Sequence, residues 1–380
     1  MKYYILPFAA VLLFSCGGSS DQSSAGNYSD ITISMDTVVV NPGDEILMAG
    51  TSSNLKINNA GSKLYFWDVQ SFHLERIDLE SLTLDEKKPF ERNGPNGVGR
   101  YPYDIHLINE EQLAFNNFSQ SIILAKMYGE VIRNISLNEE WLKADLDEGE
   151  SLTPLAFSED GKLMYCGINN FFSKSNSNIV VVDLEQEQTQ VMTLEAFQKR
   201  ENFRITFSKS TGEYMEVYAD VPKLEIISHK DQLIFWCDAF NAIYRYDPQS
   251  AELRLFEITN SLFPNEKSGT YNNDPDTKEE MQEMTKKLKE EILFSKLFWD
   301  DSNNVFYRFA SFNLPTVGDE KVKSKVFISI INEKFEVIGE QEISEIVGQV
   351  PVAQFVKDGL IYSYLNVDDE LGFIRIGINQ

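Results

Sequence analysis

Side chains that could hold a ligand recur beside one repeated strand pattern. The pattern is Leu or Val, any apolar residue, then Phe or Tyr, and the next residue falls on the opposite face of the strand. With carboxylates and amides at the strand ends, these side chains predict a pocket that suits a sugar or a peptide. The alternative is that the two tryptophans pack between neighbouring sheets. The set comprises Trp67, Asn116, Cys166, Trp236, Arg308 and Ser363, with Asp68, Asn117 and Asp238 at strand ends.

Arg308 is the strongest single candidate for ligand binding. It lies among Phe306, Tyr307 and Phe309, so its guanidinium needs a paired anion or hydrogen bonds if it is buried. A ligand carboxylate or phosphate would match its two-pronged donor geometry. Arg100, which follows a glycine-rich segment, joins the candidate ligand-binding set.

Conventional catalytic and metal-binding motifs are missing from the sequence. The histidines, His73, His106 and His229, are far apart, and none belongs to a His-Glu-x-x-His zinc motif. There is no Gly-x-Ser-x-Gly nucleophile elbow. The segment Gly94–Gly99 lacks the Lys-Ser/Thr of a phosphate loop, and Asp300–Asn304 lacks the Gly and distal Glu of a calcium loop. We therefore expect no catalytic residue, no metal and no cofactor, although scattered ligands could still meet in the folded chain.

The repeated pattern must lie on strands that recur along the whole chain. Turn-forming residues precede its copies, and the first intervals, 49 and 50 residues, suit a four-stranded propeller blade. We predict an all-β, six-bladed β-propeller of four-stranded antiparallel blades. A β-sandwich with coincidental aromatic residues is the alternative. The six aromatic residues should occupy equivalent positions in six sheets: Phe66, Phe115, Tyr165, Phe235, Tyr307 and Tyr362.

Closure of the ring is predicted from the two ends of the chain. The C-terminal blade shows three strands, the last of them Phe373–Ile378, whereas Ile31–Val40 is a strand that precedes the first full blade. If the N-terminal strand completes the last blade, a sheet edge disappears. We therefore assign residues 31–380 to one propeller domain.

The longest insertions follow second or fourth strands, which end on the same face of a propeller. The glycine-rich segment and Ala310–Lys325 belong to this set. So does one helix, predicted over Asp276–Lys296, with Thr277 and Glu280 at capping-box spacing. Its apolar stripe predicts packing on the propeller, with partner binding as the alternative. We expect Arg308 to lie near this face.

The N-terminus has the features of a bacterial lipoprotein signal. One Lys precedes a short apolar run that is too short to span a membrane. Leu13-Phe14-Ser15-Cys16 resembles a lipobox, which implies cleavage after residue 15 and acylation of Cys16. Residues 16–30 are then the lipidated cysteine and a flexible tether. We predict an outer-membrane lipoprotein, with surface display left open, and we expect Cys166 and Cys237 to be free buried thiols.

The chain is strongly acidic, with a formal net charge of −25. This charge argues against nucleic acids and anionic membrane surfaces as partners, and it also serves solubility. The expected partners are the lipid bilayer, through acylated Cys16, and a glycan, a peptide or an envelope protein. We expect a monomer.

Two long motifs resemble those of Bacteroidota lipoproteins of domain-of-unknown-function family 4221. They are Gly94-Pro95-Asn96-Gly97-Val98-Gly99 and the segment from Trp299 to Phe309, together with the acidic helical insertion. The resemblance covers essentially the whole mature chain and implies the propeller fold and the lipid anchor. Where the family often has a second Tyr, this chain has Phe306. The resemblance implies no established activity.

Two functional hypotheses follow. The first is a non-catalytic, lipid-anchored propeller that binds a ligand or partner. The second is a periplasmic or surface hydrolase or lyase of glycans, with carboxylates drawn from several blades. Clustered carboxylates would favour the second hypothesis, and an aromatic and amide rim would favour the first.

Overall fold

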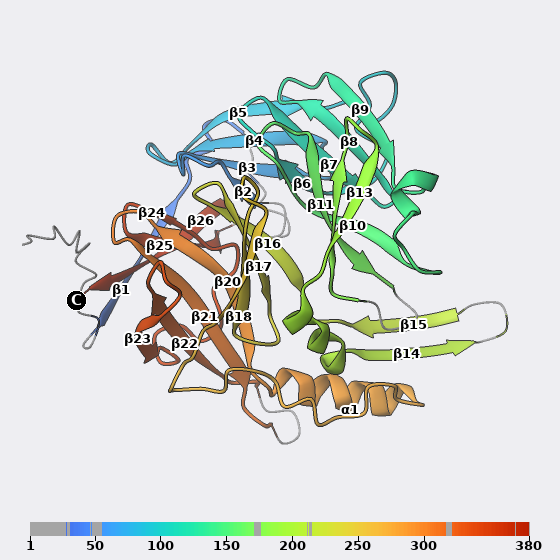
Figure 1. Cartoon of the computed structure of the whole chain (residues 1–380). Coiled ribbons are helices and arrows are strands. Elements are labelled where there is room, and N and C mark those ends of the chain that lie inside the picture. The colour runs from blue at the N-terminus through green and yellow to red at the C-terminus, as the bar shows by residue number, and fades with distance from the viewer. Residues whose placement is uncertain are drawn as a thin grey trace, which may run out of the picture.

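The computed structural model is a ring of six four-stranded antiparallel sheets (Figure 1). It describes residues 28, 31–45, 47, 55–170, 176–210, 212, 215–316, 321–368 and 370–379. The predicted fold class is confirmed. The first three blades are β2–β5 (Leu55–Ile57, Lys63–Asp68, His73–Asp78, Thr83–Pro89), β6–β9 (Pro102–Leu107, Gln112–Asn117, Ser121–Lys126, Val131–Ser136) and β10–β13 (Ser151–Phe157, Leu163–Asn169, Ile179–Asp183, Gln188–Met192).

The last three blades have the same antiparallel strand order. They are β16–β19 (Leu224–His229, Gln232–Cys237, Ala242–Asp247, Glu252–Glu257), β20–β23 (Leu293–Asp300, Val305–Asn313, Ser324–Ile331, Val337–Glu342) and β24–β26 with β1 (Phe355–Lys357, Leu360–Val367, Glu370–Asn379, Thr32–Val39). Strand β1 pairs with β26 from Thr32↔Asn379 to Val39↔Gly372, which confirms the predicted closure. The ring therefore has its first and last strands in one sheet.

All six copies of the repeated pattern lie in the second strand of a different blade, as predicted. Their faces differ, however. Tyr165 and Phe235 lie in one cluster between blades three and four, whereas Phe115 packs against blade one. Equivalent positions would all face the same neighbour, so the predicted equivalence is wrong in detail. A one-residue slip in register turns a side chain to the other face, and residue types alone do not reveal it.

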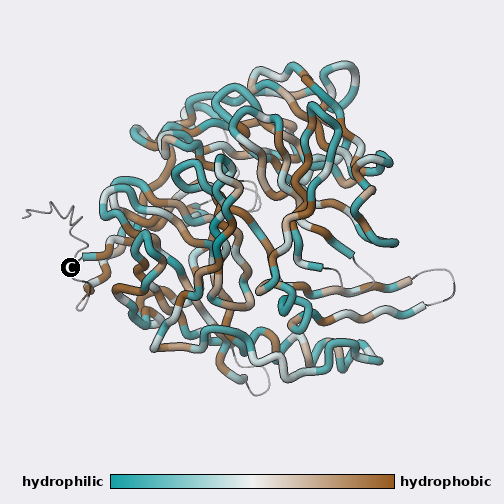
Figure 2. The backbone as a smooth tube through the Cα atoms, viewed as in Figure 1, coloured by the Kyte–Doolittle hydropathy of each residue, from teal (hydrophilic) through white to brown (hydrophobic). Residues whose placement is uncertain are grey.

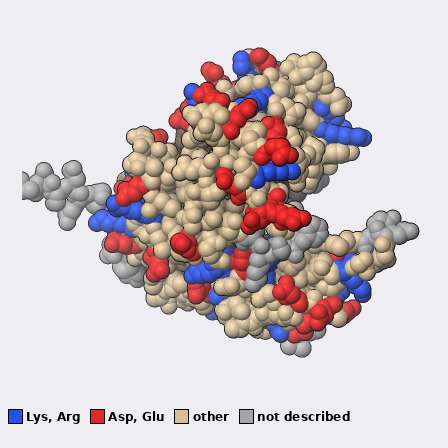
Figure 3. All heavy atoms as spheres, turned by 45° about the vertical axis from the view of Figure 1, so that its right-hand side comes forward, with Lys and Arg blue, Asp and Glu red and all other residues tan. Residues whose placement is uncertain are grey.

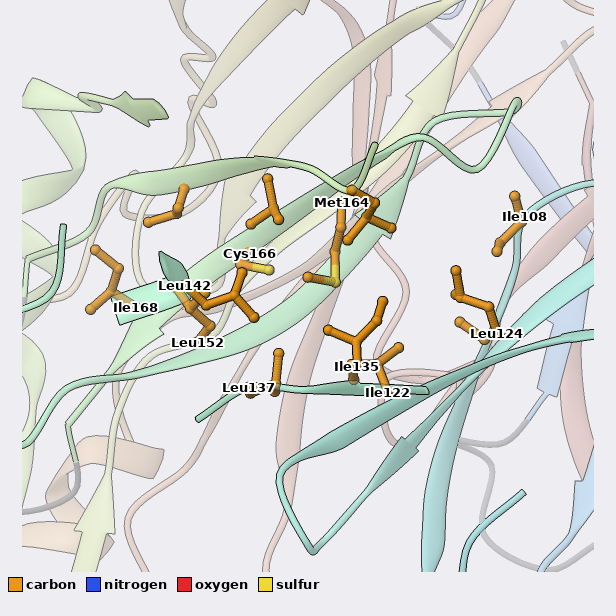
Figure 4. Packing of buried hydrophobic residues seen from close by; sticks show 14 residues of the cluster. Ile108, Ile122, Leu124, Ile135, Leu137, Leu142, Leu152, Met164, Cys166 and Ile168 are labelled. Atoms are coloured by element: carbon orange, nitrogen blue, oxygen red, sulfur yellow. The ribbon is translucent and has the colours of Figure 1, made fainter. Parts of the chain in front are cut away.

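The core consists of apolar layers between neighbouring blades. Figure 4 shows the layer between blades two and three, where Ile122 and Ile135 face Met164 and Cys166. Hydrophobic residues follow the strands through the body of the ring, and hydrophilic residues predominate in many of the connecting turns (Figure 2). Cys166 and Cys237 are free and buried, as expected, and burial raises the pKa of the Cys237 thiol to about 12.

The insertions form more regular structure than the sequence predicts. A 3-10 helix, η2 (Glu140–Lys143), follows blade two. A second one, η3 (Glu195–Phe203), and a hairpin of β14 (Ile205–Ser210) and β15 (Met215–Asp220) lie between blades three and four. The hairpin was not predicted. Its buried Ile205 and Phe207 pack against Met281, Met284 and Leu288 of the inserted helix α1.

Helix α1 is shorter than predicted, from Lys278 to Lys289 rather than from Asp276 to Lys296. Its start is as expected, because the Thr277 side chain accepts a hydrogen bond from Glu280 N at 3.1 Å. Beyond Glu290 the apolar residues alternate with a period of two, with Ile292 and Phe294 buried and Leu293 exposed. This alternation belongs to strand β20. Strands also shorten the predicted Ala310–Lys325 loop, because β21 extends to Asn313 and β22 begins at Ser324.

The insertions share one face, as predicted. Gly99 of the glycine-rich segment lies against Asn117 at the end of a second strand, β7. Near the end of another second strand, β17, Lys267 joins Ala239 to α1 by donating hydrogen bonds to Ala239 O and Leu288 O. The β21–β22 loop contacts α1 where Lys286 Nζ donates to Thr316 O.

The predicted signal peptide, residues 1–15, and Cys16 lie outside the described residues. Packing begins within the predicted tether, because Tyr28 is buried against Phe298, Tyr307 and Ile330 of blade five. A Cβ on Gly339 would lie 2.6 Å from the Tyr28 Cβ, so the glycine makes room for this contact. Tyr28, which the prediction assigned to the tether, is therefore packed on the propeller. In the described part of the chain, no helix combines the length and the apolar character needed to cross a membrane.

Candidate functional site

The residues that follow the repeated pattern are all buried. Their exposed fractions do not exceed 4%, and they belong to the layers between blades rather than to an open rim: Trp67, Asn116, Cys166, Trp236, Arg308 and Ser363. Trp67 makes edge-to-face contacts with Phe72, Phe90 and Phe115, at centroid distances of 5.4, 5.8 and 4.9 Å. For Trp67 this is the interblade packing that was the alternative to a ligand pocket.

Arg308 uses its guanidinium to join blade five to blade four. It donates to Cys237 O at 3.0 Å, to Ser295 O at 2.9 Å and to Asn241 Oδ1. Burial lowers its pKa to about 9, against the raising effect of Cys237 and Asp238, so the group stays charged at neutral pH. These hydrogen bonds to protein groups satisfy the buried guanidinium, so it needs no paired anion.

Trp236 lies beside Arg308 in the same layer, with the guanidinium carbon 5.9 Å from its ring centroid. Its indole packs with Ile243 and Phe306. Within the described residues, the buried indole Nε1 has no hydrogen-bond partner. Trp236 is therefore an interblade residue with one unused donor.

The other sequence candidates lie at the ends of strands. Asp68 accepts a hydrogen bond from Gln70 N at 2.9 Å and closes the β3–β4 turn. Asn117 donates to Val98 O at 3.0 Å and holds the glycine-rich segment. Asp238 accepts from Lys223 N at 2.8 Å, and burial raises its pKa to about 6, against the lowering effect of Lys267. Arg100 is exposed beside the Tyr101 ring.

A second set of polar side chains lies on the first strands of blades one, two, four and five, and first strands of neighbouring blades contact one another around the axis of the ring. These strands lie at one edge of their sheets, and β2 contacts β6 while β16 contacts β20. The strand register places Asp104 opposite Asn116 and Glu225 opposite Trp236. Lys296 lies in a bulge of β20 opposite the Arg308–Ala310 segment. We call Lys56, Asp104, His106, Glu225 and Lys296 the axial cluster.

One side of the axial cluster is internally paired. Lys56 Nζ lies 2.9 Å from Asp104 Oδ1. His106 Nε2 lies 3.0 Å from Asn116 Nδ2, so this ring nitrogen accepts and the other carries the proton. Burial lowers the pKa of His106 to about 4, against the raising effect of Asp104. The imidazole is therefore neutral at pH 7, and its approach to Asp104 is not an ion pair.

The other side of the axial cluster is not paired. Among the described residues, neither Glu225 nor Lys296 makes a side-chain hydrogen bond or a salt bridge. Both are partly exposed. Burial lowers the pKa of Lys296, the charge of Glu225 raises it, and the charge of Lys56 lowers it. The charges that act on Lys296 thus come from the first strands of blades four and one.

Sequence reasoning missed the axial cluster because it followed the second strands, where the repeated pattern is visible. The signal that could have found it is the register, since Asp104 and Glu225 pair directly with two of the variable residues. The first strands, of three to eight residues, carry no repeated residue type. Their polar residues are recognisable only once the pairing is known.

Two surface cavities flank the ring. One, of about 620 Å³, lies between α1, Tyr218 of β15 and the β21–β22 loop. The other, of about 400 Å³, lies at the turns of blades one to three and is lined by Glu110, Glu111 and Glu159.

The described residues contain no group of three or more His, Cys, Asp or Glu that could hold a metal ion. Acidic side chains gather on the face shown in Figure 3.

Comparisons with known proteins agree on the fold. The family model for the domain of unknown function DUF4221 matches residues 25–342. A DUF4221 protein from Bacteroides vulgatus ATCC 8482 is 15% identical, with a TM-score of 0.66 over 93% of this chain and 99% of its own. A protein of Bacteroides fragilis NCTC 9343 that is proposed to be exported is 11% identical, with a TM-score of 0.56 over 92% of this chain and 96% of its own. No curated protein matches the sequence.

Proposed function

Because the chain belongs to the DUF4221 family of domains of unknown function, we propose a role that rests on its own side chains: non-catalytic binding of a small polar ligand at the propeller axis. Glu225 and Lys296, which form no side-chain hydrogen bond or salt bridge with another described residue, carry this proposal. Arg308 and Asn117, by contrast, bond to protein groups and support the scaffold. A rigid scaffold that presents unused polar groups is suited to binding.

The axial carboxylates favour binding over glycan hydrolysis. Hydrolysis of a glycoside needs one carboxyl group that stays protonated as the general acid, beside a second one. Lys56 Nζ lies 2.9 Å from Asp104 Oδ1, so this carboxylate is already engaged in an ion pair. Asp104 is thus poorly placed to be the acid partner of Glu225. We therefore retain the catalytic role only as the weaker hypothesis.

The proposed location is the outer membrane. The lipobox-like segment before Cys16 supports export and acylation, and the similar Bacteroides fragilis protein is itself proposed to be exported. Several acyl chains on Cys16 would hold the domain stably at the bilayer. The acidic surface argues against nucleic acid as a partner.

A binding screen tests the axial site. Sugars, amino acids, dipeptides and small carboxylic acids are titrated into the purified chain by calorimetry, and into its Glu225→Gln and Lys296→Gln variants. We expect at least one compound to bind the unaltered chain and to lose tenfold or more in affinity in both variants. Glu279→Gln and Lys289→Gln, exposed on α1, make the same chemical changes away from the axis. Ligands that bind all five proteins equally would rule out the axial site.

A further inference from the structure

We propose a second binding site, separate from the axial cluster, for a linear organic polycation of the polyamine type. The site is the cavity of about 400 Å³ at the turns of blades one to three. These turns, residues 58–62, 108–111 and 158–162, each join the first strand of a blade to its second. Because the insertions follow second and fourth strands, the cavity lies on the opposite face of the ring. Its volume is within the range of small-molecule sites, about 300–1,000 Å³.

The cavity has an excess of negative charge. Its lining includes the carboxylates of Glu110, Glu111 and Glu159, and no cationic side chain is among the described residues that line it. None of these glutamates forms a salt bridge with another described residue. A ligand that enters the cavity is therefore favoured if it brings positive charge.

The lysines that follow two of the turns are paired elsewhere. Lys63 Nζ lies 2.6 Å from Asp78 Oδ2 within blade one. Lys162 Nζ lies 3.0 Å from Glu185 Oε2 within blade three. These lysines therefore do not neutralise the carboxylates of the cavity.

Hydrogen bonds fix the walls of the cavity. The buried Asn58 donates from Nδ2 to Glu110 Oε1 at 3.0 Å, and its Oδ1 accepts from Ser62 N at 3.0 Å. Asn109 Nδ2 donates to Glu159 O at 2.8 Å and joins the turn of blade two to that of blade three. The second carboxylate oxygen of Glu110 makes no hydrogen bond with a described residue. A site that is fixed before its ligand arrives loses less entropy on binding.

A buried side chain offers the cavity an unused hydroxyl. Tyr65 lines the cavity, is 4% exposed and belongs to the apolar layer between blades one and two. Its hydroxyl makes no hydrogen bond with a described residue, yet it is not among the side-chain oxygens that the protein fully encloses. The hydroxyl is therefore open to the cavity. Since a buried phenol ordinarily finds a hydrogen-bond partner, this one is available to a ligand.

The arrangement of the carboxylates selects an extended cation over a single ion. In the described part of the chain, these glutamates do not form a group that could hold a metal ion. Glu110 and Glu111 come from blade two and Glu159 from blade three, and Leu107 and Ile108 add apolar lining. A polyamine has ammonium groups separated by methylene chains. It can reach several carboxylates through charged hydrogen bonds while its methylene groups cover the apolar lining.

Calorimetry at fixed ionic strength tests the site on the purified chain. Putrescine, spermidine and spermine are titrated, with ethylammonium, calcium, magnesium and a trilysine peptide as comparators. We expect affinity to rise with the number of amino groups. Ethylammonium should bind at least about tenfold more weakly than spermidine, because the loss of one charged hydrogen bond has about this effect.

Variants assign the binding to the cavity. Glu110→Gln and Glu159→Gln keep the size of the side chain, and each should weaken spermidine binding about tenfold or more. Glu279→Gln, exposed on α1, removes the same charge elsewhere and should leave the affinity unchanged. Tyr65→Phe removes only the unused hydroxyl, so it should weaken spermidine binding about fivefold and leave the melting temperature unchanged. A residue with a purely structural role would show the reverse.

Each other outcome overturns the inference. Equal losses of affinity in Glu110→Gln, Glu159→Gln and Glu279→Gln would show attraction by the overall acidic charge. Calcium, magnesium or the peptide binding in place of the polyamines would assign the cavity to another ligand. Loss of polyamine binding in Glu225→Gln alone would place the site at the axis. Absence of polyamine binding would show that the cavity is not a polyamine site.

Discussion

At the scale of single residues, the polar side chains of the ring fall into two kinds. Arg308, Asn117 and Asp238 accept or donate hydrogen bonds within the protein and hold loops or blades together. Glu225 and Lys296 have no such partner among the described residues. This distinction separates scaffold from candidate site more clearly than residue type does, because both kinds include charged side chains.

Replacement of Arg308 by Lys should destabilise the protein. Lysine can retain one of the three hydrogen bonds of the guanidinium, and each charged hydrogen bond contributes about 1.5–3 kcal/mol. We therefore expect the free energy of unfolding to fall by about 3 kcal/mol or more, measured by urea denaturation. The matched control is Arg100→Lys, since Arg100 is exposed. An unchanged unfolding midpoint for Arg308→Lys would contradict the three-bond arrangement.

His106 should make stability depend on pH. Its pKa is lowered from 6.5 to about 4, so between these values the unfolded chain binds more protons than the folded chain. Stability contributed by His106 is therefore complete above pH 6.5 and is lost as the pH falls to 4, by about 2–3 kcal/mol. The measurement is the difference in unfolding free energy between the unaltered chain and His106→Gln, at pH 7 and at pH 4.

Asp238 provides a control of opposite sign. Its pKa is raised from 3.8 to about 6, so the folded chain binds the extra proton between these values. Relative to Asp238→Asn, the unaltered chain should gain stability as the pH falls from 6 to 4. Because the two effects have opposite signs, the pH dependence of the total unfolding free energy can hide both.

A His106→Gln difference that is flat with pH would show that the imidazole is not buried in its neutral form.

At the scale of elements, the decisive strand is β1. It forms eight residue pairs with β26, from Thr32 to Val39, and it supplies the fourth strand of the last blade. Tyr28 and Val40, which flank it, are both buried. Without β1, strand β26 would become an open edge that can pair with another molecule.

Removal of residues 1–40 should therefore destabilise the ring and promote association. Loss of two buried apolar side chains, at about 1.5–3 kcal/mol each, lowers the unfolding free energy by at least about 3 kcal/mol. Thermal unfolding and size-exclusion chromatography measure both effects. Removal of residues 1–27 is the matched control, because it keeps Tyr28 and β1. A monomer with an unchanged melting temperature after the longer deletion would show that β1 does not close the ring.

At the scale of the whole molecule, the inserted segments and the charged residues of the first strands lie in different parts of the ring. The insertions η3, β14–β15 and α1 enlarge one face, whereas the first strands bring charges from different blades to the axis. The first described residues, Tyr28 and Ile31, pack against residues of blades five and six. A lipid anchor at Cys16 would therefore join the molecule beside these blades, through a short polar segment.

The anchor makes the proposed location testable. Cys16→Ala should abolish incorporation of labelled fatty acid and leave the protein unprocessed or released from the membrane. Lys2→Arg serves as the control, because it keeps the positive charge before the apolar run and leaves Cys16 in place. Fractionation of cells and mass measurement of the N-terminus report the result. Normal processing and membrane retention of Cys16→Ala would show that the lipobox interpretation is wrong.

The sequence by itself determined the six strands with the repeated aromatic step, the closing strand β1 and the capped start of α1. Each depends on local patterns, of period two in strands and of capping residues at the Thr277 end of the helix. Only the tertiary structure decided which face each strand shows, where α1 ends and that the inserted hairpin exists. It also brought into contact the strands β16 and β20, which carry Glu225 and Lys296, although these residues lie 71 positions apart in the sequence.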